Sequence, residues 1–308
     1  MAEQKVSVEV DGHTLQLTNL HKVLYPQTGF TKGEVIDYYT RIAPVLIPHL
    51  VHRPLTVKRY PNGVDEKFFF EKNASRGTPS WIRTVNLPAP GSTKNRETID
   101  YIVVQALPDL VWLANLAALE LHVPQWQVPP RARKPRTDLL VFDLDPGAPA
   151  TITECAQVAL LLRNLLAEDG FTLFAKTSGS KGMQVSAPID VDDQDVPSQY
   201  AHAIAKQLEA AHPDLVVSRM TKSLRPGKVL VDWSQNNPAK TTVAPYSLRA
   251  REAQTVSTPI TWDEVEAGTG LRFTSEDVLA RVDEHGDLFA GTLDDSLRTR
   301  LTASMATR

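Results

Sequence analysis

The chain has 308 residues, 42% hydrophobic and 22% charged, which is the composition of an ordinary globular protein and excludes a disordered or fibrous one. Its single cysteine, Cys155, excludes a disulfide framework and a cysteine-based zinc site, and it suits a reducing cytoplasm. No signal peptide and no run of 18 apolar residues is found, so we expect a cytoplasmic protein without a membrane span.

The net charge of −3 hides an asymmetry along the chain. Residues 1–140 carry 17 Lys and Arg against 13 Asp and Glu, a net charge of +4, whereas residues 141–308 carry 16 against 23, a net charge of −7. A basic half joined to an acidic half suits a ligand that is a phosphate-bearing polymer.

The N-terminal part begins with a predicted hairpin and a predicted helix. Residues 5–18 alternate apolar and polar side chains about a short turn, which is the pattern of a β-hairpin. Thr31 and Glu34 have the spacing of a capping box and open a helix that reaches about residue 49. We expect Pro44 and Pro48 to break this helix into separate turns.

Three features of the next hundred residues bear on function. Residues 55–60 are predicted to form a strand that carries Lys58 near its end. Phe68, Phe69 and Phe70 cannot all face one side of a strand, so at least one should be exposed and able to stack on a nucleic-acid base. Residues 106–121 are predicted to form an apolar helix that ends at His122, with a basic connector over 129–137 before the next strand.

The stretch 139–147 is the centre of the functional prediction. Its four leading apolar residues predict a buried strand, and side chains two apart point to the same side, so Asp143 and Asp145 direct two carboxylates to one place. Two adjacent buried carboxylates are costly unless a cation lies between them, and a divalent metal ion supplies one. The alternative is a strand that runs out into a solvated turn. A second strand-like run that also ends in an acid, at Asp232, disfavours that alternative.

The remaining motifs have a functional and a structural interpretation. The glycine-rich turn 178–182 could hold an anion on its backbone with help from Lys181, although such turns are common and the Walker A spacing is missing. Arg225 and Arg249 lie at loop–strand junctions, where a salt bridge is the default interpretation. Helices are predicted over 151–168 and 197–212, and strands over 171–176 and 183–189. Mixed helices and strands joined by short turns favour an α+β fold.

Taken together, these motifs resemble the polymerase domain of bacterial end-joining ligase D, a branch of the archaeo-eukaryotic primase-polymerases. The resemblance covers residues from about 15 to about 300 and rests on motifs that occur in the family's order. They are Asn19 to Lys32, Val141 to Pro146, Thr177 to Gly182, Leu224 to Trp233, Gln235-Asn236, and Ala244 to Arg249. The resemblance implies one catalytic domain over 1–308, with a primase-polymerase β-sheet core flanked by helices. Within it, a DNA-end-binding part would span about 1–137 and a metal- and nucleotide-binding part about 138–308.

The resemblance also implies roles for particular residues. The catalytic, metal-binding residues would be Asp143, Asp145 and Asp232, holding two divalent ions, Mn²⁺ or Mg²⁺. The nucleotide-binding residues would be His122, Ser178, Lys181, Arg225, Gln235 and Arg249. The residues for the 5′-phosphate of a downstream DNA strand would be Asn19, Lys22 and Lys32. The template-binding residues would be Lys58, Phe69 and Phe70.

The phosphate site also has a physical rationale. The turn between Lys22 and Lys32 can bring both ammonium groups to one point, beside N–H groups expected to be free at the start of the predicted helix. Each lysine could equally be a solvated surface charge.

The implied activity is metal-dependent, template-directed nucleotide addition in DNA repair. It would prefer ribonucleotides and act at short gaps or double-strand-break ends that bear a downstream 5′-phosphate, with DNA and nucleoside triphosphates as ligands. Since the chain has no ligase motif, a separate ligase and an end-binding protein are expected partners. One alternative is a haloacid-dehalogenase-type phosphatase, which shares the strand-borne acid pair but needs a further acidic pair. The other is a non-catalytic DNA-end-binding scaffold, which the three acids disfavour.

Overall fold

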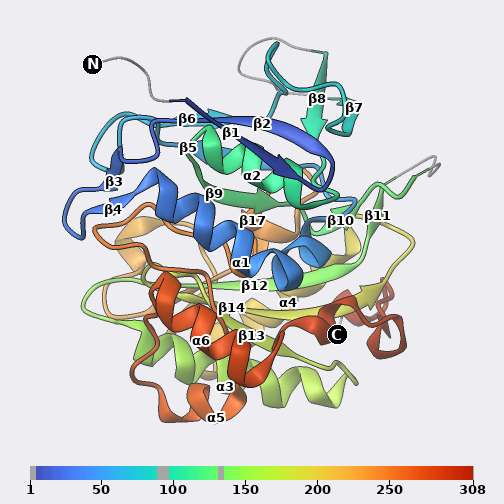
Figure 1. Cartoon of the computed structure of the whole chain (residues 1–308). Coiled ribbons are helices and arrows are strands. Elements are labelled where there is room, and N and C mark those ends of the chain that lie inside the picture. Colours follow the sequence, from blue (N-terminus) through green and yellow to red (C-terminus); the bar gives the residue numbers. More distant parts are fainter. Residues whose placement is uncertain (1–4, 89–96, 131–134, 308) are drawn as a thin grey trace.

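The computed structural model describes residues 5–88, 97–130 and 135–307 (Figure 1). Residues 131–134 of the predicted basic connector lie outside these ranges. The α-helices are α1 (Lys32–Leu50), α2 (Leu107–Asn115), α3 (Ile152–Glu168), α4 (Val196–Ala211), α5 (Trp262–Ala267) and α6 (Ser275–His285). The described helices and mixed sheets confirm the α+β class expected from the sequence.

The larger sheet holds the predicted acidic strands. Its strands follow the order β15 (Val216–Val217), β16 (Val229–Asp232), β12 (Leu139–Pro146), β14 (Met183–Asp190), β13 (Phe174–Thr177) and β18 (Pro259–Ile260), and β19 (Thr299–Arg300) pairs with β14. Leu140, Phe142 and Leu144 of β12 are buried in one core with α3 and α4. Because side chains alternate along a strand, Asp143 and Asp145 lie on the opposite face of β12.

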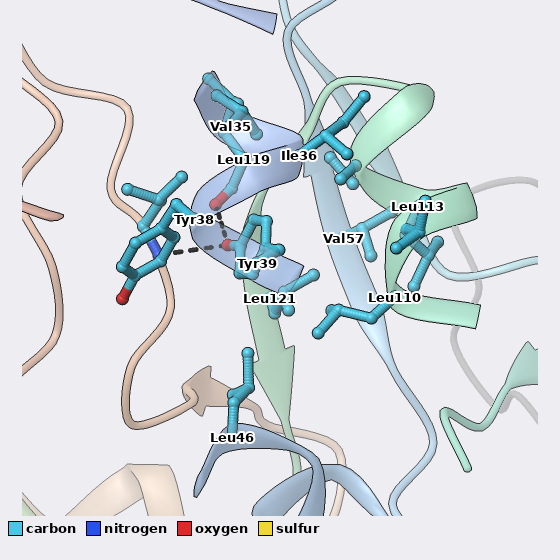
Figure 2. Close-up of a cluster of buried hydrophobic side chains, with 14 of the residues drawn as sticks. Val35, Ile36, Tyr38, Tyr39, Leu46, Val57, Leu110, Leu113, Leu119 and Leu121 are labelled. Atoms are coloured by element: carbon cyan, nitrogen blue, oxygen red, sulfur yellow. Dashed lines mark hydrogen bonds between the residues drawn. The ribbon is translucent and has the colours of Figure 1, made fainter. Parts of the chain in front are cut away.

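The smaller sheet lies above the larger one in Figure 1. Its order is β17 (Thr242–Val243), β9 (Ala118–Val123), β5 (Thr56–Arg59) and β6 (Phe69–Glu71), and α1 and α2 cover it. Figure 2 shows Tyr39 of α1 packed beside Leu119 and Leu121 of β9. The Tyr39 hydroxyl donates to Leu119 O (2.8 Å) and accepts from Leu248 N (3.1 Å). This second core therefore includes residues from the C-terminal half of the chain.

Short pairs of strands complete the described structure. The predicted N-terminal hairpin is present as β1 (Lys5–Val10) and β2 (His13–Thr18). The other pairs are β3 (Val23–Tyr25) with β4 (Phe30–Thr31), β7 (Thr84–Pro88) with β8 (Thr98–Ile102), and β10 (Trp126–Gln127) with β11 (Arg136–Thr137). Within the described ranges, no helix combines the length and the apolar character needed to cross a membrane.

Two local predictions were wrong. Helix α1 begins with the predicted Thr31–Glu34 capping box but continues through Pro44 and Pro48 to Leu50. Its apolar face is fully buried at Leu46 and Leu50, and this burial outweighs the hydrogen bonds that the prolines cannot make.

The second wrong prediction is the helix over 106–121. Helix α2 ends at Asn115, Ala117 adopts a positive φ of 57°, and residues 118–123 form β9. His122 therefore lies on a strand. The alternation of Leu119 and Leu121 with Glu120 and His122 has the period of two that marks a strand.

Candidate active site

Three carboxylates meet on the larger sheet. In the antiparallel register of β12 and β16, Asp143 lies directly opposite Asp232, and Asp145 is two residues further along β12 on the same face. One oxygen from each of these three side chains lies within 4.8 Å of the other two. The convergence predicted from two separate sequence motifs is therefore present, although Asp143 lies within the strand rather than beyond its end.

Neighbouring amides and a hydroxyl orient two of these carboxylates. Gln184 Nε2 donates to Asp143 Oδ1 (3.0 Å). Asp232 Oδ1 accepts from the backbone N (3.0 Å) and Oγ (2.6 Å) of Ser234, and its Oδ2 accepts from Gln235 Nε2 (2.8 Å). Gln235, predicted to lie near the nucleotide, thus contacts one of the three converging acids in this structure.

The electrostatics of the three acids fit a divalent cation. Burial, followed by repulsion from Asp145, raises the pKa of Asp143 to about 7. A cation between the carboxylates would remove this repulsion, and clustered carboxylate oxygens are the ligands that Mg²⁺ and Mn²⁺ prefer. The acids therefore fit the expected metal site.

A cleft of about 490 Å³ opens beside the acids. It brings together predicted residues from six segments of the chain. Among its lining side chains are Asp143, Asp145, His122, Ser178, Lys181, Arg225, Gln235 and Arg249. The cleft also includes Gln184 and Arg251, which the sequence did not single out.

Two glycines allow the turn 178–182, which lines the cleft, to lie very close to neighbouring backbone. A Cβ on Gly182 would lie 2.0 Å from Leu144 O, and a Cβ on Gly179, whose φ is +66°, would lie 2.6 Å from the backbone of Val256. Ser178 Oγ accepts from the N–H groups of Ser180 and Gly182, each at 3.2 Å. Two of the N–H groups expected to face an anion therefore point at a side chain within the turn, while the Ser178 hydroxyl still has a proton to donate.

Two of the cleft arginines, Arg225 and Arg249, donate to backbone carbonyls. Arg249 Nη1 donates to Ser178 O (2.7 Å), which ties the guanidinium to the glycine-rich turn. Arg225 Nη2 donates to Met220 O (2.6 Å) across its own loop. The salt bridge that was the default interpretation is present at Arg249, whose Nε lies 3.4 Å from Glu120 Oε1.

Glu120 is a central residue that the sequence analysis missed. Its side chain is 2% exposed, yet it meets His122 Nε2 (2.9 Å), Lys58 Nζ (3.1 Å) and Arg249 Nε (3.4 Å). Although burial opposes ionisation, these partners hold the pKa of Glu120 well below its usual range. A charged residue within an otherwise apolar strand was the signal available in the sequence.

The predicted template residues lie on the smaller sheet, away from the acids. Phe69 and Phe70 are 48% and 51% exposed, and Phe68 is 46% exposed. Phe70 pairs with Lys58 across β5 and β6, and Lys58 Nζ lies 5.7 Å from the centroid of the Phe68 ring. The prediction of an exposed aromatic beside a cation is confirmed.

The predicted phosphate residues lie in the turn between β2 and β3 and at the start of α1. Lys22 and Lys32 are backbone neighbours, since Lys32 N donates to Lys22 O (2.8 Å), and Lys22 N donates to Asn19 O (3.0 Å). Their ammonium groups have different partners. Lys22 Nζ donates to Asn62 Oδ1 (2.9 Å), and Lys32, only 6% exposed, donates to Thr18 O (2.6 Å).

The expectation of free N–H groups at the start of α1 was wrong. The amides of Lys32, Gly33 and Glu34 donate to Lys22 O, Leu20 O and Thr31 Oγ1, respectively. The preceding segment folds back over the helix end and satisfies these donors. A phosphate at this place would therefore depend on side chains.

Comparison with known proteins identifies several similar sequences. A family model described as "LigD, primase-polymerase domain" matches residues 31–289. The multifunctional non-homologous end joining protein LigD of Mycolicibacterium smegmatis is 46% identical over 277 residues, which are 90% of this chain and 36% of that protein. The bifunctional LigD of Bacillus subtilis is 31% identical over 290 residues, 92% of this chain and 45% of that protein. The chain thus spans less than half the length of these relatives.

A solved structure agrees with the sequence matches. The polymerase domain of Mycobacterium tuberculosis ligase D, in complex with DNA, superposes with a TM-score of 0.85 at 42% identity. The match covers 91% of this chain and 98% of that domain.

Proposed function

This chain belongs to the LigD primase-polymerase domain family, and on that premise we propose that it adds nucleotides to primer 3′ ends in DNA repair. Membership makes it a nucleotidyltransferase of the primase-polymerase class, which excludes the phosphatase alternative. The relatives are named for non-homologous end joining, and we propose the same repair context here.

One observation carries the proposal of catalysis. Three carboxylates from two paired strands converge beside a cleft that also collects Lys181, Arg225 and Arg249. Clustered acids that bound no cation would only repel one another, which disfavours a non-catalytic scaffold. Acids and cations that line the same cleft suit a metal-bound triphosphate.

The residues of the chain have separable tasks in this reaction. Lys181, Arg225 and Arg249 would bind the triphosphate and neutralise the charge that develops on the leaving pyrophosphate. Gln184 and Gln235 would orient Asp143 and Asp232 through the hydrogen bonds that they already make.

Asp143, Asp145 and Asp232 would hold the metal, for which we propose Mn²⁺ or Mg²⁺. Bound there, a divalent ion would polarise the α-phosphate and lower the pKa of the primer 3′-hydroxyl. No covalent nucleophile on the protein is required, because the primer hydroxyl supplies the attacking oxygen.

The proposed substrate is DNA with a short gap or a broken end. The M. tuberculosis domain was solved in complex with DNA, which supports DNA as a ligand here. The template strand would stack on Phe69 and Phe70 beside Lys58, and the downstream 5′-phosphate would contact Lys22, Lys32 and Asn19. A ligase activity and an end-binding protein would complete the repair.

A primer-extension assay tests this proposal. The substrate is a gapped duplex with a downstream 5′-phosphate, given Mn²⁺ or Mg²⁺ and either ribonucleotides or deoxyribonucleotides. We expect templated, metal-dependent extension of the primer that is faster with ribonucleotides. The control variant Asp145→Asn should bind the duplex without extending the primer. Failure of the wild type to extend any primer with either metal would refute the proposal, and a deoxyribonucleotide preference would refute its nucleotide selectivity.

A further inference from the structure

We infer that Glu120 is a positioning residue for nucleotide selection. Through it, His122 carries its proton on Nε2, which leaves Nδ1 as a hydrogen-bond acceptor for a sugar hydroxyl of the incoming nucleotide. This inference deepens the proposed function and rests on it. It gives a task to a buried carboxylate that lies outside the three-acid cluster and outside the residues lining the cleft.

The geometry begins on β9. Glu120 and His122 are two residues apart and so share a face of the strand, whereas Leu119 and Leu121 face the core with Tyr39. His122 is the member of this pair that lines the cleft. Glu120 lies behind it and joins it through the 2.9 Å contact between Oε2 and Nε2.

The protonation of the pair follows from the charge of Glu120. An ionised carboxylate only accepts hydrogen bonds, so Nε2 of His122 must be the donor. Burial, together with the nearby cations Arg249 and Lys58, lowers the pKa of His122 despite the opposing effect of Glu120. The ring is therefore neutral near pH 7.5, and a neutral ring with its proton on Nε2 has an unprotonated Nδ1.

The same carboxylate links three structural elements. Glu120 Oε2 also meets Lys58 Nζ of β5, and Glu120 Oε1 accepts from Ala250 N (3.1 Å) beside the Arg249 contact. A fully buried carboxylate is costly, and a donor from each of these segments is needed to offset that cost. One residue thereby contacts a histidine and an arginine of the nucleotide cleft, together with Lys58, which lies on β5 beside the exposed phenylalanines.

An unprotonated Nδ1 selects the kind of group that it binds. Phosphate oxygens only accept hydrogen bonds, so Nδ1 cannot bind the triphosphate, whereas sugar hydroxyls can donate. A templated enzyme must accept every base, so a fixed acceptor is better matched to the sugar than to a base edge. A ribonucleotide offers two such hydroxyls, and a 2′-deoxynucleotide lacks one of them.

The variant Glu120→Gln tests the inference through steady-state kinetics. Because Arg249 Nε and Ala250 N can only donate, they favour the glutamine oxygen at the position of Oε1, so the amide NH₂ faces Nε2. This contact shifts the His122 proton to Nδ1, which turns the acceptor into a donor. We expect the ratio of ribonucleotide to deoxyribonucleotide kcat/KM to fall about tenfold, mainly through a higher ribonucleotide KM. The matched control is Asp109→Asn, because Asp109 is also a buried carboxylate (4% exposed) but caps α2 away from the cleft. It should leave the ratio unchanged.

A second measurement does not depend on activity. Long-range ¹H–¹⁵N spectra of the wild type, assigned by comparison with His122→Gln, should show His122 protonated only on Nε2 at pH 7.5. Protonation on Nδ1 in the wild type, or an unchanged sugar ratio in a folded Glu120→Gln variant, would overturn the inference. If the wild type extends no primer, the proposed function fails, while the spectrum still decides the state of His122.

Discussion

Replacing Asp143 with asparagine is expected to abolish nucleotide addition and, without metal, to stabilise the protein at pH 8. Burial and repulsion by Asp145 raise the pKa of Asp143 from 3.8 to about 7. Between these two pH values the folded state binds more protons than the unfolded state, so stability falls as the pH rises. This rise in pKa corresponds to a loss of about 4 kcal/mol by pH 8, an upper limit for this carboxyl.

Urea unfolding in EDTA at pH 5 and pH 8 measures the larger part of this loss, because the remainder has already occurred below pH 5. Between these two pH values the wild type should lose up to about 2.5 kcal/mol more than Asp143→Asn, because the amide cannot ionise. Added Mn²⁺ at pH 8 should restore the wild type and have little effect on the variant, since an ion that binds only the folded state stabilises it. Asp37→Asn is the control, because Asp37 is an exposed helix residue paired with Arg41 at 3.6 Å.

Three results would contradict this reasoning. Equal pH dependence of the wild type and Asp143→Asn in EDTA would mean that burial and repulsion do not raise the pKa of Asp143 in the folded protein. Primer extension by Asp143→Asn at the wild-type rate would remove this residue from the metal site. A shift in Asp37→Asn as large as that in Asp143→Asn would instead assign the effect to net charge.

Three further outcomes are expected. The wild type should bind gaps with a downstream 5′-phosphate about tenfold more tightly than gaps ending in a 5′-hydroxyl, as measured by fluorescence anisotropy. The double variant Lys22→Ala, Lys32→Ala should bind both kinds of gap equally, and equal affinities of the wild type would contradict the phosphate site. Phe69→Ala should weaken binding to a template overhang by about 1–3 kcal/mol, because a base can no longer stack on the ring. The melting temperature should not fall, because this side chain is 48% exposed, and an unchanged affinity would exclude stacking there. Arg53→Ala should lower the free energy of unfolding in urea by about 3–5 kcal/mol, because it leaves Asp138 buried without its bidentate partner (2.7 and 2.9 Å). A loss below about 1 kcal/mol would show that the pair is dispensable.

Local sequence patterns were sufficient for most elements and for the acids. The capping box at Thr31, the apolar run that ends in Asp143 and Asp145, and the second run ending in Asp232 each follow from spacing within a few residues. A strand's period of two already places the first two acids on one face. The family resemblance then identified further residues that line the cleft, although they are far apart in the sequence and no local pattern relates them.

Only the tertiary structure decided what those residues contact. The register of β12 against β16, which places Asp143 opposite Asp232, joins positions 89 residues apart and is set by the pairing of the whole sheet. Packing also keeps α1 helical through its prolines. The segment before α1 accepts hydrogen bonds from the N–H groups that were expected to be free. Glu120 shows the difference most clearly, since the three side chains that it contacts come from β5, β9 and the segment after β17. A sequence shows that a charge lies in an apolar strand, but long-range folding determines the groups that compensate it, because burial brings together residues that are far apart in the chain.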